Sequence, residues 1–284
     1  SAENVIIGGD RANANPLDGD GADHIYIESG TVFTASTIYG GGGNDTVTFS
    51  ADMTASTVSM GAGADIFTAV GGTIILDSTV GLGNGGDIFK SVGDNQILSS
   101  RINAAKGADS VYFVDNDIAS GADYGSTTVY GGAGADYLLG SASVLTQDQT
   151  VAIELEYQTA SESTLSAFDT IAVQVTDNVS AKYSFRYEPG ATQASFSAAK
   201  ATATNGVVTF SAGFDNNLTA RAAYVADNTS AGNAAGFIDG DSKAYLFVKG
   251  SSDNLLVQVG SAAVSGVGAV DLNASKNIDL TILG

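Results

Sequence analysis

Six glycine–aspartate turns recur along the first half of the chain, and they restrict its fold more than any other feature. They end at Asp23, Asp45, Asp65, Asp87, Asp109 and Asp136, with spacings of 22, 20, 22, 22 and 27 residues. The residue two positions after each aspartate is apolar. A turn that returns at one phase with a period near 21 residues is typical of a solenoid.

Short runs of alternating polar and apolar residues separate the turns. Thr46–Ser50 and Ser56–Met60 follow Asp45, and 66–70 and 73–76 follow the next turn. Alternation with period two, bounded by Gly and Asp, predicts β-strands. We therefore expect a flattened parallel β-solenoid with two strands per coil and apolar side chains pointing inward.

The second half of the chain has a different pattern. Of the 36 glycines, 25 precede residue 151, and the composition changes near 141–150. Clean alternation then predicts strands at Val151–Tyr157, Thr170–Val175, Lys182–Tyr187, Val207–Phe210, Ala244–Val248 and Leu255–Val259, and an Ala-rich stretch predicts one helix at Leu218–Ala226. The predicted fold class is all-β, with a solenoid over residues 1–145 and an antiparallel β-sandwich-like domain over residues 146–284.

The turns have the composition of a cation site. Glycines allow backbone conformations in which carbonyl groups converge, and calcium takes six to eight carbonyl and carboxylate oxygens. Six stacked turns leave five gaps, so we expect up to about five calcium ions between neighbouring coils. The expected ligands lie at Asp18, Asp20, Asp23, Asp45, Asp65, Asp87, Asp109 and Asp136 and at Gly41, Gly43, Gly61, Gly63, Gly83, Gly85, Gly132 and Gly134.

The charge balance favours a cationic partner. The chain carries 31 acidic and 11 basic side chains, a net charge of −20, so nucleic acid and anionic membranes would be repelled. It has no cysteine, and no apolar stretch approaches the ~20 residues needed to cross a bilayer. No signal peptide is visible at Ser1–Asn4, so we expect either a longer parent chain or export through a C-terminal signal.

No catalytic constellation is visible, and we expect no enzyme activity. The chain has one histidine, His24, so it has no two-histidine zinc motif, and no imidazole–nucleophile pair is visible. We expect His24 to lie on the surface. Glu154 and Glu156 share a face of an ordinary alternating strand. The aromatic side chains of 183, 185 and 187 favour core packing over a sugar platform. Asp239–Asp241 fits either a further calcium loop or a simple turn.

The repeats resemble the RTX, or haemolysin-type, calcium-binding nonapeptide G-G-x-G-x-D-x-U-x. Gly40–Val47 and Gly131–Leu138 match in full, and the turns ending at Asp23, Asp65 and Asp87 depart only at the first glycine. The turn ending at Asp109 keeps only the last glycine and the aspartate, so we expect the weakest calcium binding beside it. The resemblance implies a calcium β-roll, although RTX arrays carry the motif on both edges and this chain on one. Segments 240–250, 255–260 and 278–284 look like the C-terminal region of RTX proteins exported by type I secretion.

Three functions remain open at this point. The first is a structural component of a bacterial surface layer (S-layer) or extracellular matrix, secreted to the cell surface, folded by calcium and self-associating into a lattice or homo-oligomer. The second is an adhesin fragment that binds a glycan or a protein. The third is the C-terminal calcium and secretion part of an exported enzyme or toxin.

Overall fold

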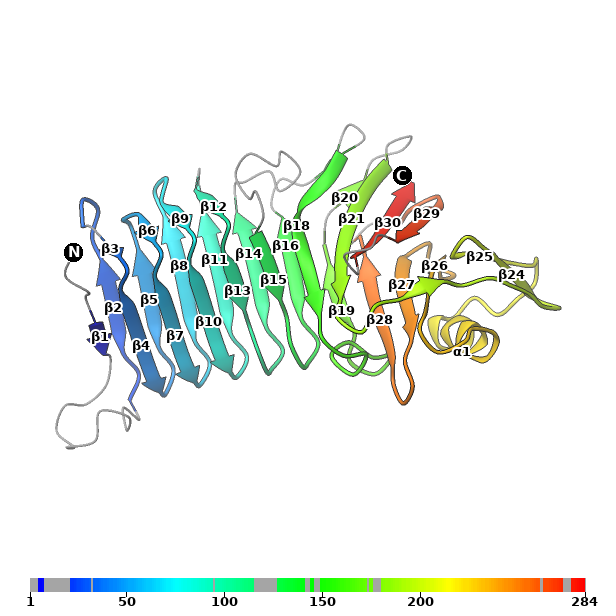
Figure 1. Cartoon of the computed structure of the whole chain (residues 1–284), viewed down its shortest axis with the longest axis horizontal. Coiled ribbons are helices and arrows are strands. Elements are labelled where there is room, and N and C mark those ends of the chain that lie inside the picture. Colours follow the sequence, from blue (N-terminus) through cyan, green and yellow to red (C-terminus); the bar gives the residue numbers. More distant parts are fainter. Residues whose placement is uncertain are drawn as a thin grey trace. The chain divides into compact units, whose positions relative to one another are not determined.

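The computed structural model describes residues 5–7, 21–31, 33–93, 95–114, 127–140, 144–145, 149–172, 174–175, 180–260, 263–272 and 277–283. The chain divides into two compact units, Ser1–Ala142 and Ser143–Gly284. Nearly all of the regular structure is β, as predicted (Figure 1). None of the described helical structure is long and apolar enough to cross a membrane.

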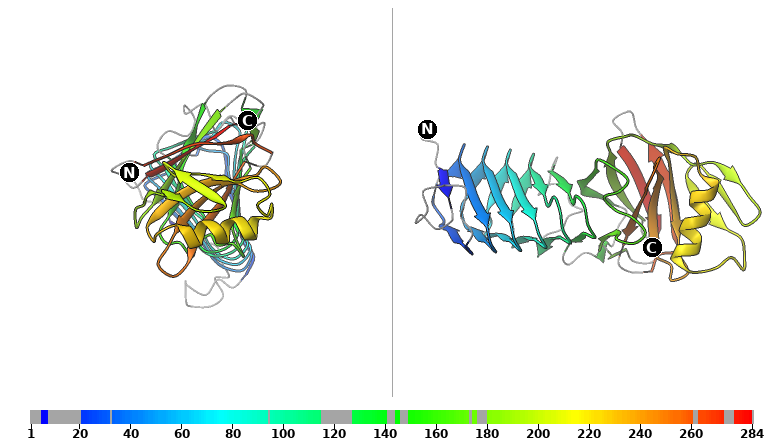
Figure 2. Two further views of the ribbon diagram at one scale, coloured as in Figure 1. Left: turned by 90° about the vertical axis from the view of Figure 1, so that its right-hand side faces the viewer. Right: turned by 90° about the horizontal axis from the view of Figure 1, so that it is seen from below.

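The first unit is a parallel β-solenoid, which confirms the predicted fold class for this part. Its strands are β1 (Val5–Ile7), β2 (His24–Ile27), β3 (Phe33–Thr34), β4 (Thr37–Gly42), β5 (Thr46–Phe49), β6 (Met53–Thr54), β7 (Thr57–Ala62), β8 (Ile66–Val70), β9 (Ile74–Leu76), β10 (Thr79–Asn84), β11 (Ile88–Val92), β12 (Gln96–Leu98), β13 (Arg101–Asn103), β14 (Ser110–Val114), β15 (Thr127–Tyr130) and β16 (Tyr137–Gly140). Equivalent strands of successive coils lie side by side (Figures 1 and 2).

Three parallel sheets run along this unit. Their strand orders are β1-β4-β7-β10-β13-β15, then β2-β5-β8-β11-β14-β16, and β3-β6-β9-β12. A complete coil therefore holds three strands, such as β5, β6 and β7 between Asp45 and Asp65. The prediction of two strands per coil is wrong. Between Asp45 and Asp65 the missed strand is β6, whose two residues are too few to show alternation, and in the next coil it is β10, which is rich in glycine.

Each coil buries its apolar residues in rows that continue from one strand to the next. On the second sheet, Val47, Phe67 and Phe89 are in register and fully buried. A buried Phe at one position is matched by a small residue two positions on, as in Phe67 with Ala69. The rings of Phe33, Phe49, Phe67, Phe89 and Phe113 form successive contacts with centroids 5.1–6.1 Å apart. This core fixes the register of the coils, and so it also aligns their turns.

The second unit mixes antiparallel and parallel pairs. Its elements are β17 (Val144–Leu145), β18 (Gln149–Tyr157), β19 (Asp169–Ile171), β20 (Gln174–Val175), β21 (Ser180–Tyr187), β22 (Thr192–Gln193), β23 (Phe196–Ser197), β24 (Ala201–Thr204), β25 (Val207–Phe210), α1 (Leu218–Asn228), β26 (Asn233–Ile238), β27 (Ala244–Lys249), β28 (Asn254–Val259), β29 (Gly266–Leu272) and β30 (Asn277–Leu283). The predicted helix corresponds to α1, whose N-cap Asn217 accepts a hydrogen bond from Ala220 N.

Antiparallel pairing joins β21 to β30, β29 to β30, and β23 to β24 to β25, and also β26 to β27 to β28. Parallel pairs, which the alternation did not predict, join β18 to β21 and β19 to β28. Tyr183, Phe185 and Tyr187 of β21 are all buried, as expected for a core role. The core near α1 contains Val225, Phe237 and Phe247, among others.

Candidate metal centre

The six predicted aspartates lie at one corner of the solenoid, where each strand of the first sheet turns into the second sheet. We call them the aspartate column: Asp23, Asp45, Asp65, Asp87, Asp109 and Asp136. The residues that follow them are paired in parallel register from β2 to β16. Asp18 and Asp20, the other two predicted ligands, lie outside the described residues. The sequence therefore placed six carboxylates on one edge correctly.

The predicted glycines bend the backbone at this corner. Gly41, Gly43, Gly61, Gly63, Gly83, Gly85, Gly132 and Gly134 all have positive φ, from 92° to 151°. Space is also limiting, because a Cβ on Gly61 would lie 1.9 Å from the carbonyl oxygen of Gly41. Each coil thus points backbone carbonyls at the glycines of the next coil, where only a residue without a side chain fits.

One carboxylate oxygen of each coil bonds the preceding coil. The backbone N–H of Asp45 donates to Oδ1 of Asp65 at 2.7 Å, and that of Asp65 donates to Oδ1 of Asp87 at 2.8 Å. The same bond joins Asp23 to Asp45, Asp87 to Asp109, and Asp109 to Asp136, at 2.8–2.9 Å. The aspartates therefore hold the coils together directly, a role that the sequence did not reveal.

The second carboxylate oxygen has no such partner. Oδ2 of Asp23, Asp45, Asp65, Asp87 and Asp109 is buried and accepts no hydrogen bond, and these five form no ion pair among the described residues. A buried carboxylate oxygen without a donor or a cation is costly. Among the described residues, these five atoms are the feature that most favours a cation at this corner.

The pKa values of the aspartate column also indicate that its negative charge is not compensated. Burial raises the pKa of the Asp45, Asp65 and Asp87 carboxyls, and the backbone hydrogen bonds offset this only in part. For Asp109, burial together with the neighbouring charges of Asp136 and Asp87 raises the pKa to about 7. Negative charge at this corner is disfavoured in the cation-free fold.

The residues present fit an oxygen-binding cation better than a transition metal. The column contains no His or Cys side chain, and among the described residues no three His, Cys, Asp or Glu side chains converge on one point, so a cation here needs backbone carbonyls as well. Neighbouring coils instead offer one free carboxylate oxygen each, beside backbone carbonyls. At Gly40, for example, Asp45 Oδ2 and the carbonyl oxygen of Met60 both lie 2.4 Å from where a Cβ would be. Carboxylate and carbonyl oxygens in combination suit calcium.

The turn before Asp109 departs from the pattern and stores strain. Ala105 occupies the place of a glycine and has φ 74°, a left-handed conformation that costs an L-residue about 1–2 kcal/mol. Its turn still delivers Asp109 to the column, with hydrogen bonds on both sides.

Replacing Ala105 with Gly is expected to stabilise the first unit by about 1 kcal/mol, because glycine adopts this φ without strain. Chemical denaturation in calcium-containing buffer measures the change. The matched control is Ala108→Gly in the same turn, where φ is not positive, so added backbone freedom should destabilise by roughly 0.5–1 kcal/mol. Equal effects of the two substitutions would contradict the strain at Ala105.

A second ladder, missed by the sequence analysis, lies at another corner. The serine ladder consists of Ser36, Ser56, Ser78 and Ser100: the N–H of each of the first three donates to Oγ of the next at 3.1 Å. The residue before each serine has φ of 48–50° without being glycine. The spacings of 20, 22 and 22 match those of the aspartates, and this was the available signal. The hydrogen bonds of this ladder join neutral groups alone.

The remaining candidates have ordinary structural partners. Asp239 accepts hydrogen bonds from the N–H groups of Asp241 and Lys243 and from the hydroxyl of Tyr245, which is the pattern of a turn. Glu154 accepts from Asn277 Nδ2 at 2.8 Å. His24 is exposed.

The comparisons with known proteins add no family to this picture. No protein-family model matches the chain, and a search of curated proteins gives no match. The fold and the turn geometry are compatible with an RTX-type β-roll.

Proposed function

We propose that the chain is a calcium-binding structural protein of a bacterial surface layer or extracellular matrix, with an RTX-type β-roll as its first unit. The observation that carries this proposal is the row of buried, unpartnered Oδ2 atoms on Asp23, Asp45, Asp65, Asp87 and Asp109. Calcium supplies the positive charge that this row lacks.

The ions would be held by carboxylates of the aspartate column and by carbonyls of the glycine turns. Calcium bound there joins consecutive coils and neutralises carboxylates that otherwise repel each other one coil apart. In a low-calcium cytosol the first unit stays unfolded and suited to export, by a type I system in our proposal. Outside the cell, at millimolar calcium, it folds and assembles at the cell surface.

The test uses the purified full chain at pH 7.5. Calorimetric titration with calcium is expected to give up to about five bound ions per chain, since six aspartates leave five gaps. Negative-stain electron microscopy should then show ordered arrays in calcium and none in chelator, with magnesium as the matched control because it prefers octahedral sites rich in water.

The two parts of the proposal fail separately. Absence of calcium binding would overturn the metal centre. Stoichiometric binding without arrays, at protein concentrations up to the millimolar range, would keep the metal centre but overturn the lattice.

A further inference from the structure

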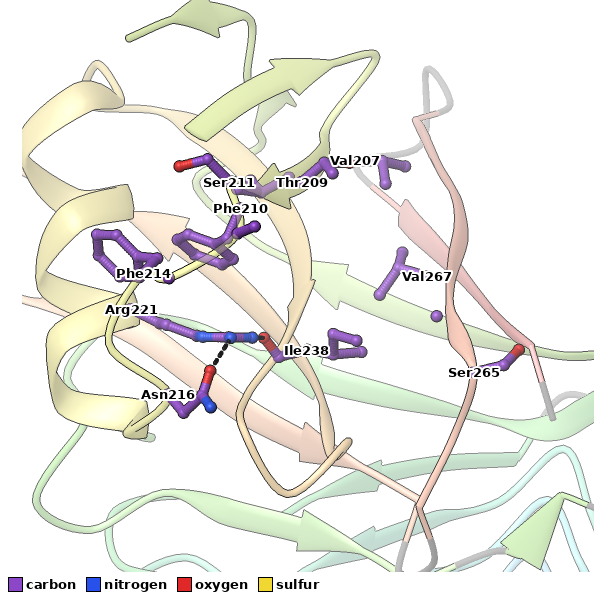
Figure 3. Close-up of a pocket in the computed structure, with 14 residues that line it drawn as sticks. Val207, Thr209, Phe210, Ser211, Phe214, Asn216, Arg221, Ile238, Ser265 and Val267 are labelled. Atoms are coloured by element: carbon purple, nitrogen blue, oxygen red, sulfur yellow. Dashed lines mark hydrogen bonds between the residues drawn. The ribbon is translucent and has the colours of Figure 1, made fainter. Parts of the chain in front are cut away.

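The second unit contains a pocket of about 400 Å³ that the proposed calcium function does not use. It lies between β25, the loop that follows it, the first turn of α1, the end of β26 and the start of β29 (Figure 3). Its size suits a single small-molecule unit such as a monosaccharide.

The guanidinium of Arg221 is fixed in the wall of this pocket (Figure 3). Nη1 donates to the carbonyl of Ile238 at 2.6 Å, Nη2 to Oδ1 of Asn216 at 2.8 Å, and Nε to the carbonyl of Asp215 at 3.2 Å. The group also lies 4.8 Å from the centre of the Phe210 ring. Arg221 is therefore oriented before any ligand arrives, which lowers the entropic cost of binding.

All of these acceptors are neutral, so the positive charge of Arg221 is not compensated. Its side chain takes no part in the ion pairs of the described residues. Of the acidic side chains close to it in sequence, Asp215 accepts hydrogen bonds from the N–H and Nδ2 of Asn217 through Oδ1, and Arg221 bonds only its backbone carbonyl. Arg221 also sits at the N-terminal end of α1, where the helix dipole is positive and the first turn holds no acidic residue. In a chain of net charge −20, this is a local site for an anion.

The hydrogen-bonding capacity of Arg221 indicates which anion fits. A guanidinium has five N–H donors, and three are used, which leaves one on each terminal nitrogen. A carboxylate accepts two parallel N–H bonds from arginine. The rest of the pocket is lined by apolar Val207 and Val267 and by Thr209, Ser211 and Ser265. The hydroxyls of Ser211 and Ser265 donate to the carbonyls of Lys200 and Leu283, so they can offer a sugar only acceptor oxygens.

We propose that this pocket binds a carboxylate-bearing sugar, a uronic acid unit of an acidic polysaccharide, through Arg221. The site is independent of the aspartate column, because every residue that forms it belongs to the second unit. It gives the chain a means to hold acidic glycan separately from the calcium-dependent fold.

The test is a titration of the full chain with glucuronate, at constant calcium and pH 7.5, followed by NMR. A dissociation constant in the range of about 0.1–10 mM is expected for a single sugar unit. Glucose, which lacks the carboxylate, should bind at least 10-fold more weakly. Equal binding of glucose, or no binding of glucuronate at 50 mM (a limit about fivefold above that range), would overturn the proposal.

Two variants locate the site. Arg221→Gln should weaken glucuronate binding at least 10-fold, whereas Arg186→Gln, which removes the same charge from a residue paired with Glu188, should leave it unchanged. Because Arg221 also braces its loop, Gly266→Phe is the second variant: Gly266 lines the pocket and a Cβ there meets nothing within 4 Å, so a ring can be added at the pocket wall with Arg221 intact. Retained binding in a folded Gly266→Phe chain would place the ligand elsewhere and contradict the proposal.

Discussion

Removal of calcium with a chelator at pH 7.5 is expected to unfold the first unit and to leave the β structure of the second unit in place. The cause is the aspartate column, in which Asp45, Asp65, Asp87 and Asp109 are buried and carry oxygens without a donor. Without a cation their desolvation and mutual repulsion oppose folding. Hydrogen exchange, read separately on peptides of each unit, measures the effect, and the second unit serves as the internal control.

Low pH is expected to restore part of the folded first unit when calcium is absent. A carboxyl whose pKa is raised in the folded state binds its proton more tightly there, so protonation favours folding. This contribution is complete below the unfolded value near 3.8 and is lost as pH rises through the folded value, about 7 for Asp109. In chelator, the far-ultraviolet β signal should therefore be stronger at pH 5.5 than at pH 8. In saturating calcium it should be the same at both.

Two results would count against this account. The first is a chelated first unit that stays fully protected from exchange at pH 8. The second is a β signal in chelator that falls on acidification, since the raised pKa values require the opposite sign.

Replacing Asp87 with Asn is expected to have opposite effects in the two states of the protein. In chelator it should stabilise the first unit by about 1–3 kcal/mol, because it removes a buried charge that also raises the pKa of Asp65 and Asp109. The amide oxygen can still accept the bond from Asp65 N. In saturating calcium the same change should destabilise by about 3 kcal/mol, since a carboxylate beside two gaps is lost.

Asp52→Asn is the matched control for this substitution. Oδ1 of Asp52 also accepts a hydrogen bond from the next coil, donated by Ile74 N at 2.9 Å, but the Asp52 side chain is exposed. The change in charge is identical, so Asp52→Asn should alter stability by less than about 0.5 kcal/mol in either buffer. Urea denaturation in saturating calcium measures the three values for the calcium-bound state. In chelator, the far-ultraviolet β signal of the three proteins is compared instead, and it should be stronger for Asp87→Asn than for the other two. A change of the same sign in both buffers for Asp87→Asn would contradict a cation at the column.

Much of the solenoid could be predicted because its signals repeat. The alignment of Asp45, Asp65 and Asp87 followed from spacing alone, and burial of the apolar rows then fixed the register. One strand of each coil was missed: β6, with two residues, has no periodicity to detect, and the glycines of β10 made it look like part of the turn. The serine corner was missed because residues such as Ala55 and Asp77 take positive φ there in place of the glycine that normally marks such a turn.

The sequence predicted the residue types of the candidate centre, but it did not predict the hydrogen bonds that these residues form. The glycine–aspartate pattern indicates that Asp65 favours a cation. It does not show that Oδ1 of Asp65 accepts a hydrogen bond from the N–H of Asp45 while Oδ2 accepts none. That division depends on the distance between coils. The Arg221 pocket had no sequence signal, because its walls come from three parts of the chain, 207–221, Ile238 and 265–267, that alternation cannot bring together.

The hydrogen bonds of the aspartate column all run in one direction, from the amide of an earlier coil to the carboxylate of the later one. From Asp23 to Asp109, each coil is therefore linked to the next one in the same way and in the same direction. Duplication or loss of a whole 20- or 22-residue coil preserves each of these links. Such a molecule can change its length over evolutionary time in steps of one coil without any new packing having to arise.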